Sequence, residues 1–337
     1  MPTSIPLRAR GEKVQGDFVR FASSILFLVA IVPPSTYAFD GPLETKNQFP
    51  LFSQLNTVSF ESARLENSNA ASFSYSSIYF MKQSADWQAS LDMEVAEVNI
   101  RMRRSFYDSF ELGIEVPIVS FNAWFMDGAI ERFHGLFGFA TYGRQNRPEN
   151  EFLYEVKRNG TTLIKGESDH AGLADVRLTA KKVLTSSDPF ITMKLAVELP
   201  TGDAKKGYGN GNVGADLSLL LDKQIRERYM TYWNLGVARP GDINGYEKIK
   251  TKYFAFGGAG VETAIWDTWN ILAQWTVQQS PYPKTGIRSV DSSAHQVTLG
   301  ARYRGENGGN FDVTLAEDSN GGGVPDVTFS FSYKKKF

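Results

Sequence analysis

The last residues of the chain alternate between apolar and polar side chains. Val327, Phe329, Phe331, Tyr333 and Phe337 form an apolar row, and most residues between them are polar. A side-chain period of two is that of a β-strand and not of a helix. We therefore predict that the chain closes with a strand that has one apolar face, one polar face and an aromatic residue at its end.

Two kinds of protein contain such a strand. A soluble β-sandwich buries the apolar face of the strand against a second sheet. The final strand of a bacterial outer-membrane β-barrel has the same alternation, and its terminal aromatic residue belongs to the signal that the barrel-insertion machinery recognises. In a barrel, Phe337 and Tyr333 would form part of that signal. The rest of the chain has to distinguish the two structures.

Eleven further segments have the pattern of strands, which gives about 12 strands. Segments of about ten residues have the length that a tilted strand needs to cross a membrane. The eleven segments are residues 70–81, 88–103, 105–120, 172–184, 190–199, 213–222, 229–238, 252–264, 269–278, 294–304 and 311–316.

The connections between these segments alternate between short turns and longer loops, except that Lys82–Asp86 is short where a longer loop is expected. Short turns on one side and long loops on the other are typical of outer-membrane barrels, and a soluble sandwich has no reason to sort its loops in this way. Backbone groups in lipid need internal partners, so the sheet has to close on itself. We predict an all-β fold, in which residues 70–337 form a transmembrane antiparallel up-and-down β-barrel.

Two stretches depart from simple alternation. In residues 88–103 the apolar positions change from odd-numbered to even-numbered residues, which predicts a β-bulge near Ala96 and Glu97. Residues 121–171 form an insertion. Its first part, 121–146, has the apolar spacing of an amphipathic helix, and 151–166 is predicted to be a hairpin that turns at Asn159-Gly160.

The N-terminus has the three parts of a secretory signal peptide. Basic residues precede the apolar run 21–32, and Ala38 is a suitable cleavage site. An uncleaved anchor is the alternative, but the apolar run is short for one. Residues 1–38 are therefore predicted to be a signal peptide. Residues 39–69, which have two prolines and no clear period in 40–56, are predicted to be an irregular periplasmic segment.

Composition excludes several classes of function. The formal net charge is −1, so no strongly basic face indicates nucleic acid as a partner. The chain has no cysteine, which excludes disulfides and thiolate metal sites. The three histidines, His134, His170 and His295, are too far apart in sequence for a metal-ligand motif. We predict no metal and no cofactor.

The polar rows of the strands are predicted to line a lumen with mixed charge. The helix adds a polar side that could face the same lumen, or solvent. We name as pore-lining or constriction candidates Asp127, Glu131, His134, Glu111, Glu115, Arg177, Glu198, Arg302 and Arg304.

Residues 122–138 resemble part of a known family. This stretch, with Gly143-Arg144 and Arg147-Pro148 after it, is similar to the FLD-x-x-I-x-x-F-H-x-x-F-G helix of the uncharacterised bacterial family DUF3187. The resemblance covers nearly all of the chain after the predicted signal peptide. It implies an outer-membrane barrel without an assigned activity, and it supplies no catalytic residues. The chain departs from the family pattern at Ala123-Trp124, where the family tends to have Gly-Gly.

Three functions remain open. We expect a passive pore or small-solute channel in the outer membrane of a Gram-negative bacterium, surrounded by lipid and restricted by the 121–171 insertion. The alternatives are an enzyme that acts on lipid and a structural or surface-interaction barrel. Few histidines argue against the enzyme. Ser168 and His170 are close in sequence, but closeness in sequence does not make a catalytic triad.

Overall fold

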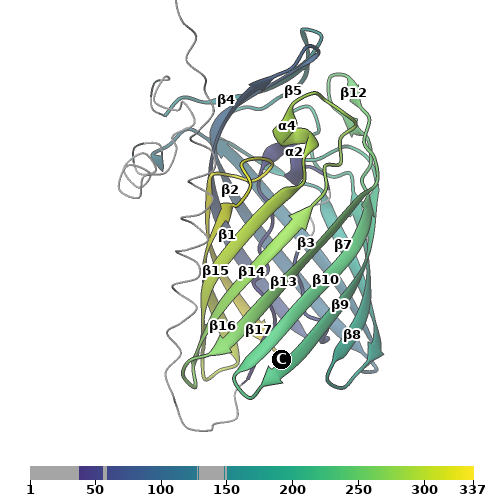
Figure 1. Ribbon diagram of the computed structural model, residues 1–337, viewed down its shortest axis with the longest axis vertical. Coiled ribbons are helices and arrows are strands. Elements are labelled where there is room, and N and C mark those ends of the chain that lie inside the picture. Colours follow the sequence, from purple (N-terminus) through teal and green to yellow (C-terminus); the bar gives the residue numbers. More distant parts are fainter. Residues whose placement is uncertain (1–37, 56–58, 127, 129–147, 149) are drawn as a thin grey trace, which may run out of the picture.

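The protein is a closed β-barrel with a stretch of its own N-terminal chain inside (Figure 1). The computed structural model describes residues 38–55, 59–126, 128, 148 and 150–337. Two short helices, α2 (Pro50–Ser53) and α4 (Arg288–Asp291), lie near one end of the barrel (Figure 1). None of the helices in these residues is long and apolar enough to cross a membrane.

Twelve antiparallel strands make the barrel wall, which confirms the predicted fold class. Each strand pairs with its neighbours in this order, and the last strand pairs with the first, with Phe73 opposite Phe331. In chain order the strands are β1 (Ser68–Gln83), β2 (Trp87–Phe106), β3 (Phe110–Asn122), β7 (Val176–Thr185), β8 (Phe190–Leu199), β9 (Gly214–Arg226), β10 (Tyr229–Arg239), β13 (Phe254–Ala264), β14 (Trp269–Gln278), β15 (Ala294–Arg304), β16 (Gly309–Asp318) and β17 (Val327–Lys336).

The two faces of the wall differ in chemistry, as the alternation predicts. Outward-facing apolar side chains such as Leu219 and Phe331 are exposed, at 46% and 45%. Their neighbours along the strands, such as Ser218 and Ser330, are buried. An apolar outer surface around a polar interior is the arrangement that lipid imposes on a barrel, because only the interior can solvate polar groups.

The two ends of the barrel carry different connections. Residues 107–109, 186–189, 227–228, 265–268 and 305–308 are short, and together they form what we call the turn end. The opposite end, which we call the loop end, carries the longer connections and one short one, residues 84–86 between β1 and β2. The C-terminus lies at the turn end (Figure 1). The predicted sorting of short and long connections is therefore present in the structure.

The loop end holds the remaining small elements. The predicted hairpin is present, and Asn159 and Gly160 at its turn have φ angles of 50° and 78°. Glycine at the second position avoids the cost of a side chain at positive φ. The predicted helix 121–146 lies largely outside the described residues. The elements are β4 (Leu153–Arg158), β5 (Thr161–Lys165), β6 (His170–Leu173), β11 (Ile243–Asn244) and β12 (Lys248–Ile249).

The β-bulge predicted near Ala96 is wrong. Strand β2 pairs with β1 and with β3 in continuous register through this position. The apolar row changes parity because the environment changes along the strand. Leu91 faces inward and is fully buried in an apolar cluster at the loop end, whereas Ile100 faces outward and is 42% exposed.

Most of the stretch 39–69, which is predicted to be an irregular periplasmic segment, lies inside the barrel, and its last two residues begin β1 (Figure 1). Residues 38–55 and 59–67, which we call the lumenal segment, contact inward-facing side chains of many strands. For example, Glu44 forms an ion pair with Arg101 of β2, and Glu61 forms one with Lys194 of β8. The segment is irregular as predicted, but its charges are buried within the barrel, where they meet opposite charges.

Candidate functional site

The lumenal segment passes through the barrel twice. Near its start, Phe39 packs at the turn end in a cluster with Met230 of β10. At the loop end, Asn47 donates a hydrogen bond of 2.5 Å to the carbonyl oxygen of Gly323. Residues 59–67 run back toward the turn end, where β1 begins at Ser68. The interior of the barrel therefore holds two passes of the same chain.

Apolar contacts hold the middle of the segment at the loop end. Phe49, Phe52 and Leu55 are almost fully buried in one cluster with wall and loop residues. The Phe49 ring meets the edge of Phe80 with ring centroids 5.1 Å apart. The Tyr282 hydroxyl donates a hydrogen bond to the Leu51 carbonyl oxygen. This part of the segment is packed like the core of a soluble protein.

Ion pairs hold the part of the segment that lies nearer the turn end. The carboxylate of Glu44 lies in the fork of the Arg103 guanidinium, with both oxygen–nitrogen distances at 2.8 Å. Arg101 Nη1 lies 2.7 Å from the same carboxylate, and Lys334 Nζ lies 3.3 Å from it. A bidentate arginine–carboxylate pair is among the strongest and most specific hydrogen-bonded arrangements in proteins.

The second pass supplies two more carboxylates to the same region. Glu61 lies 2.7 Å from Lys194 Nζ and 3.1 Å from Lys181 Nζ. Glu66 lies 3.0 Å from Lys334 Nζ. Arg103 reaches both glutamates at 3.4 Å, so it links the two passes.

We call the five wall cations in this region the basic cluster. They lie on the four strands β2, β7, β8 and β17, and all five are buried. They are Arg101, Arg103, Lys181, Lys194 and Lys334.

The surrounding cations keep the segment's carboxylates ionised. Burial raises the pKa of Glu44, but the charges of Arg101 and Arg103 outweigh it and hold that pKa well below its usual range. Burial also raises the pKa of Glu61, and Lys194 with Arg103 lowers it further than burial raises it. The pKa of Glu66 is lowered in the same way, mainly by Lys334 acting against burial.

The constriction candidates on the first half of the wall take part in this network or border it. Glu111 lies 3.2 Å from Lys181 Nζ and accepts a hydrogen bond of 2.6 Å from the Glu66 backbone. Glu115 forms an ion pair of 2.6 Å with Lys46 of the segment. Both candidates are therefore buried partners of the lumenal segment.

The remaining candidates contact wall, loop and segment residues, and Arg302 also donates a hydrogen bond of 2.6 Å to the Gly41 carbonyl oxygen of the segment. Arg177 forms an ion pair with Asp216, and Arg302 lies 2.8 Å from Asp312. Glu198 accepts a hydrogen bond of 3.0 Å from Asn210. Arg304 lies at the turn end, where it donates hydrogen bonds to the backbone oxygens of Ala38 and Asp267. The helix candidates Asp127, Glu131 and His134 lie outside the described residues.

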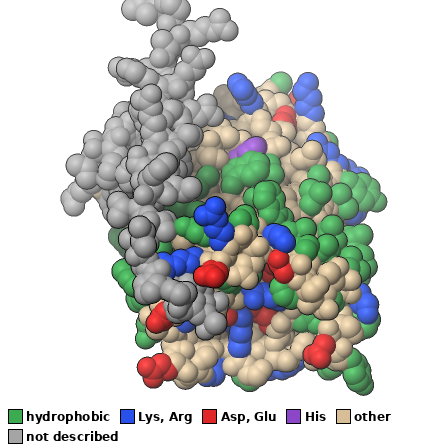
Figure 2. All heavy atoms as spheres, turned by 60° about the horizontal axis from the view of Figure 1, so that its bottom comes forward, with side chains coloured by type: hydrophobic (Ala, Val, Ile, Leu, Met, Phe, Trp, Pro, Cys, Tyr) green, Lys and Arg blue, Asp and Glu red, His purple; other side chains and the backbone are tan. Residues whose placement is uncertain are grey.

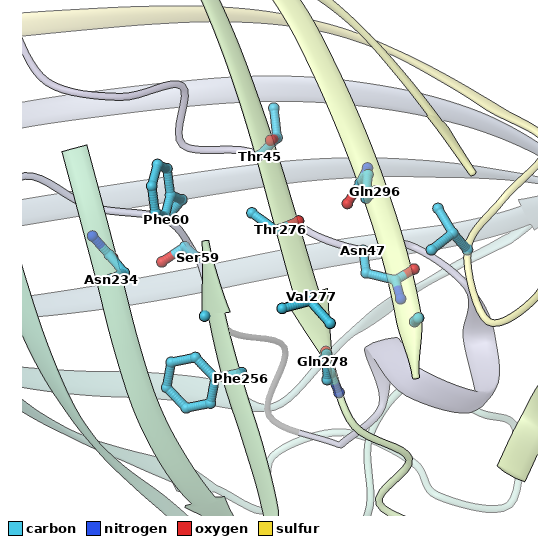
Figure 3. Close-up of a pocket in the computed structure, with 13 residues that line it drawn as sticks. Thr45, Asn47, Ser59, Phe60, Asn234, Phe256, Thr276, Val277, Gln278 and Gln296 are labelled. Carbon is cyan, nitrogen blue, oxygen red and sulfur yellow. The ribbon is translucent and has the colours of Figure 1, made fainter. Parts of the chain in front are cut away.

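Small cavities remain between the segment and the wall. The first has a volume of about 30 Å³, room for about two water molecules, and its lining is mostly uncharged. Phe60 and Phe256 line one part of it, and Gln296 and Thr276 line another (Figure 3). The second has a volume of about 40 Å³ and a charged lining that includes Lys46. Each of these two cavities has room for only a few water molecules.

A family model matches residues 21–337, and its description is a protein of unknown function, DUF3187. The chain belongs to this family. A comparison with curated proteins finds no relative that matches the sequence.

Solved structures similar to this DUF3187 protein are outer-membrane channels and porins. One is the COG4313 outer membrane channel from Pseudomonas putida F1, with a TM-score of 0.54 and 10% sequence identity, covering 91% of this chain and 100% of that chain. Another is the KdgM porin, with a TM-score of 0.42 and 8% identity, covering 80% and 99%. At such identities the likeness to the COG4313 channel concerns the fold.

In this DUF3187 protein, Ser168 and His170 do not form the serine–histidine pair of a hydrolase. The Ser168 hydroxyl donates to Asp169, and the Nδ1 atom of His170 contacts the Ser168 carbonyl oxygen at 2.8 Å. The histidine therefore does not activate the serine hydroxyl, as a triad requires. Within the same residues no group of His, Asp and Glu side chains could hold a metal ion.

Sequence reasoning missed the most connected residues of the lumen, namely Glu44, Glu61 and Glu66. They lie in a stretch without periodicity, where a glutamate is usually solvated. One indication was available. Lys334 lies on the polar face of the closing strand, and a buried lysine in a lumen needs a carboxylate partner.

Proposed function

We propose that this protein is an outer-membrane channel for small solutes whose path is closed by the lumenal segment. The observation that carries the proposal is the way the segment is held. Nearer the turn end, the contacts between segment and wall are mostly ion pairs and hydrogen bonds, such as the fork of Arg103 on Glu44. Rehydration of both members of such a pair costs little, because a buried ion pair is close to break-even against its hydrated parts.

The composition of the wall supports the same proposal. The inward face of the wall carries buried charges, such as Arg177, Lys194 and Arg302. Burying charges costs free energy unless each is paired. A charged wall is suited to a lumen that is hydrated in one of its states. The fold shared with the COG4313 outer membrane channel is consistent with this function.

The element that restricts the path differs from the one that the sequence favours. The sequence favoured the 121–171 insertion, most of whose first part lies outside the described residues. The lumenal segment fills the barrel at the level of the basic cluster, so we assign the restriction to it. We keep the export signal in residues 1–38, the outer membrane of a Gram-negative bacterium and the surrounding lipid as parts of the proposal.

Conductance in planar bilayers tests the channel. The purified full chain is compared with the double variant Glu44→Gln/Glu61→Gln, which keeps the size of both side chains and removes their charges. Glu167→Gln is the matched control, because Glu167 pairs with Lys206 on the exposed surface at the loop end. We expect rare, small openings for the wild type and the control, and frequent larger ones for the double variant. Absence of current from all three proteins would refute the channel.

A further inference from the structure

We propose that the solutes of this channel are small organic anions with two or more carboxylate groups, which take the places that Glu44, Glu61 and Glu66 occupy in the closed lumen. This inference rests on the proposed channel and names its substrate class. The three glutamates act as an internal substitute for the solute. The distribution of charge, with cations on the wall and carboxylates on the segment, supports the same class of solute.

The basic cluster is built as a carboxylate site. Arg103 presents both terminal nitrogens to the two oxygens of Glu44 at 2.8 Å, and Arg101 adds a third contact at 2.7 Å. A planar guanidinium fork matches the geometry of a carboxylate in a way that chloride or a neutral solute cannot reproduce. The two arginines that make this site are buried and lie on β2, near its turn-end terminus.

The cations belong to the wall, whereas most of their partners belong to the segment. Glu44, Glu61 and Glu66 all come from the lumenal segment. The wall supplies Glu111 beside Lys181, and Glu115, which itself pairs with Lys46 of the segment. When the segment leaves, the basic cluster keeps its five positive charges and loses three negative ones. This part of the lumen then attracts anions, whereas the buried carboxylates elsewhere on the wall, such as Asp216 and Asp312, keep partners on the wall in Arg177 and Arg302.

The spacing of the contacts favours anions with more than one carboxylate. Arg103 contacts Glu44 at 2.8 Å and both Glu61 and Glu66 at 3.4 Å, so several carboxylates lie around one guanidinium. A solute with a single carboxylate can replace one of these glutamates. A solute with two or three can replace several at once, and linked groups bind with an increased effective concentration.

Competition between solute and segment gives the first test. The chain has no cysteine, so the variant Ala63→Cys carries a single thiol on the second pass, at a position that is 2% exposed. Its labelling rate by a large maleimide reports displacement of the segment. We expect citrate at millimolar concentration to raise this rate several-fold, and sodium chloride of equal ionic strength to leave it unchanged. Equal effects of the two salts would refute the inference.

A variant of the cluster sharpens this test. In the background of Ala63→Cys, Arg103→Gln removes the fork, and we expect the citrate effect to disappear. Lys194→Gln serves as a second variant in case the first does not fold, and a shift in gel mobility on heating checks that each variant forms a barrel. A citrate effect that persists in both folded variants would overturn the assignment of the basic cluster.

Ion selectivity separates this inference from the proposed channel. The reversal potential of the Glu44→Gln/Glu61→Gln variant is measured in a gradient of potassium chloride. We expect a potential close to that of chloride, and block of the current by citrate but not by glucose. A cation-selective or non-selective current would leave the channel intact and refute the anion inference. If no variant conducts, the channel fails, and the labelling result alone decides whether the lumen binds polycarboxylates.

Discussion

Substitution of Glu61 by glutamine should release the lumenal segment without opening the barrel wall. The carboxylate lies 2.7 Å from Lys194 Nζ and 3.1 Å from Lys181 Nζ, and both lysines are buried. Removing one member of a buried ion pair while its partner stays charged costs about 3–5 kcal/mol. Glutamine keeps a hydrogen-bond acceptor, so we take about 3 kcal/mol, which corresponds to about two orders of magnitude in an equilibrium constant. The cost falls on the closed lumen, because displacement of the segment hydrates both lysines.

Labelling of the Ala63→Cys thiol measures this displacement equilibrium. With Glu61→Gln, we expect the labelling rate to rise by about two orders of magnitude, provided that displacement is fast relative to labelling. Glu167→Gln removes the charge from a surface ion pair of similar length, 2.8 Å, and should leave the rate unchanged. Equal rates for Glu61→Gln and Glu167→Gln in folded barrels would refute the view that ion pairs hold the segment.

Three further predictions concern the lipid face, pH and the C-terminus. Leu219→Arg places a charge near the middle of β9 on the outer face and should lower folding stability in liposomes by about 2–4 kcal/mol, as measured by urea titration, whereas Leu219→Met should not. The pKa values of Glu44 and Glu61 are lowered in the closed lumen. The two carboxylates therefore stabilise the closed state fully at pH values above their ordinary pKa near 4.5, and this stabilisation is lost as the pH falls below 4.5. Channel opening should increase as the pH is lowered below 4.5. Phe337 is 65% exposed and its ring lies 4.9 Å from the Arg104 guanidinium, so Phe337→Ser should leave refolding of the purified protein intact and reduce assembly in cells, as judged by heat-shifted gel mobility.

The barrel could be predicted because lipid imposes a local pattern on the sequence. Every strand that crosses the membrane has to alternate, and residues such as Leu217 and Leu219 show this without knowledge of their partners. The incorrect prediction of a β-bulge in β2 shows where this alternation no longer reports on lipid contact. At the loop end, the inward face of β2 packs on an apolar cluster, so its apolar residues Leu91 and Met93 point inward. Farther along the strand the inward face is polar, and the apolar residue Ile100 points outward.

The lumenal segment could not be predicted for a related physical reason. Its stability comes from partners on strands that are distant in sequence, and no local pattern records them. Glu61 meets Lys181 and Lys194, which follow it by more than a hundred residues. The local sequence around a glutamate in an irregular stretch does not show whether its side chain is solvated or buried. Pairing decides between these outcomes, and pairing is a property of the closed barrel.

The two ways in which the segment is held predict that it leaves only in part. At the loop end, Phe49, Leu51, Phe52 and Leu55 are almost fully buried, and each contributes about 1.5–3 kcal/mol through apolar burial. Citrate cannot replace these contacts, whereas it can replace the carboxylate of Glu44 or Glu61.

Two thiol positions on the same segment distinguish partial from complete displacement. Leu51 and Ala63 are both nearly inaccessible in the closed lumen, at 4% and 2% exposure. With millimolar citrate, we expect labelling of Ala63→Cys to accelerate and labelling of Leu51→Cys to stay slow, because α2 remains packed at the loop end. Residues 59–67 are also tied to β1 at Ser68, so their movement is limited to the lumen and the turn end. Equal acceleration at both positions would show that the segment leaves as one unit, and that apolar packing at the loop end does not outlast the ion pairs.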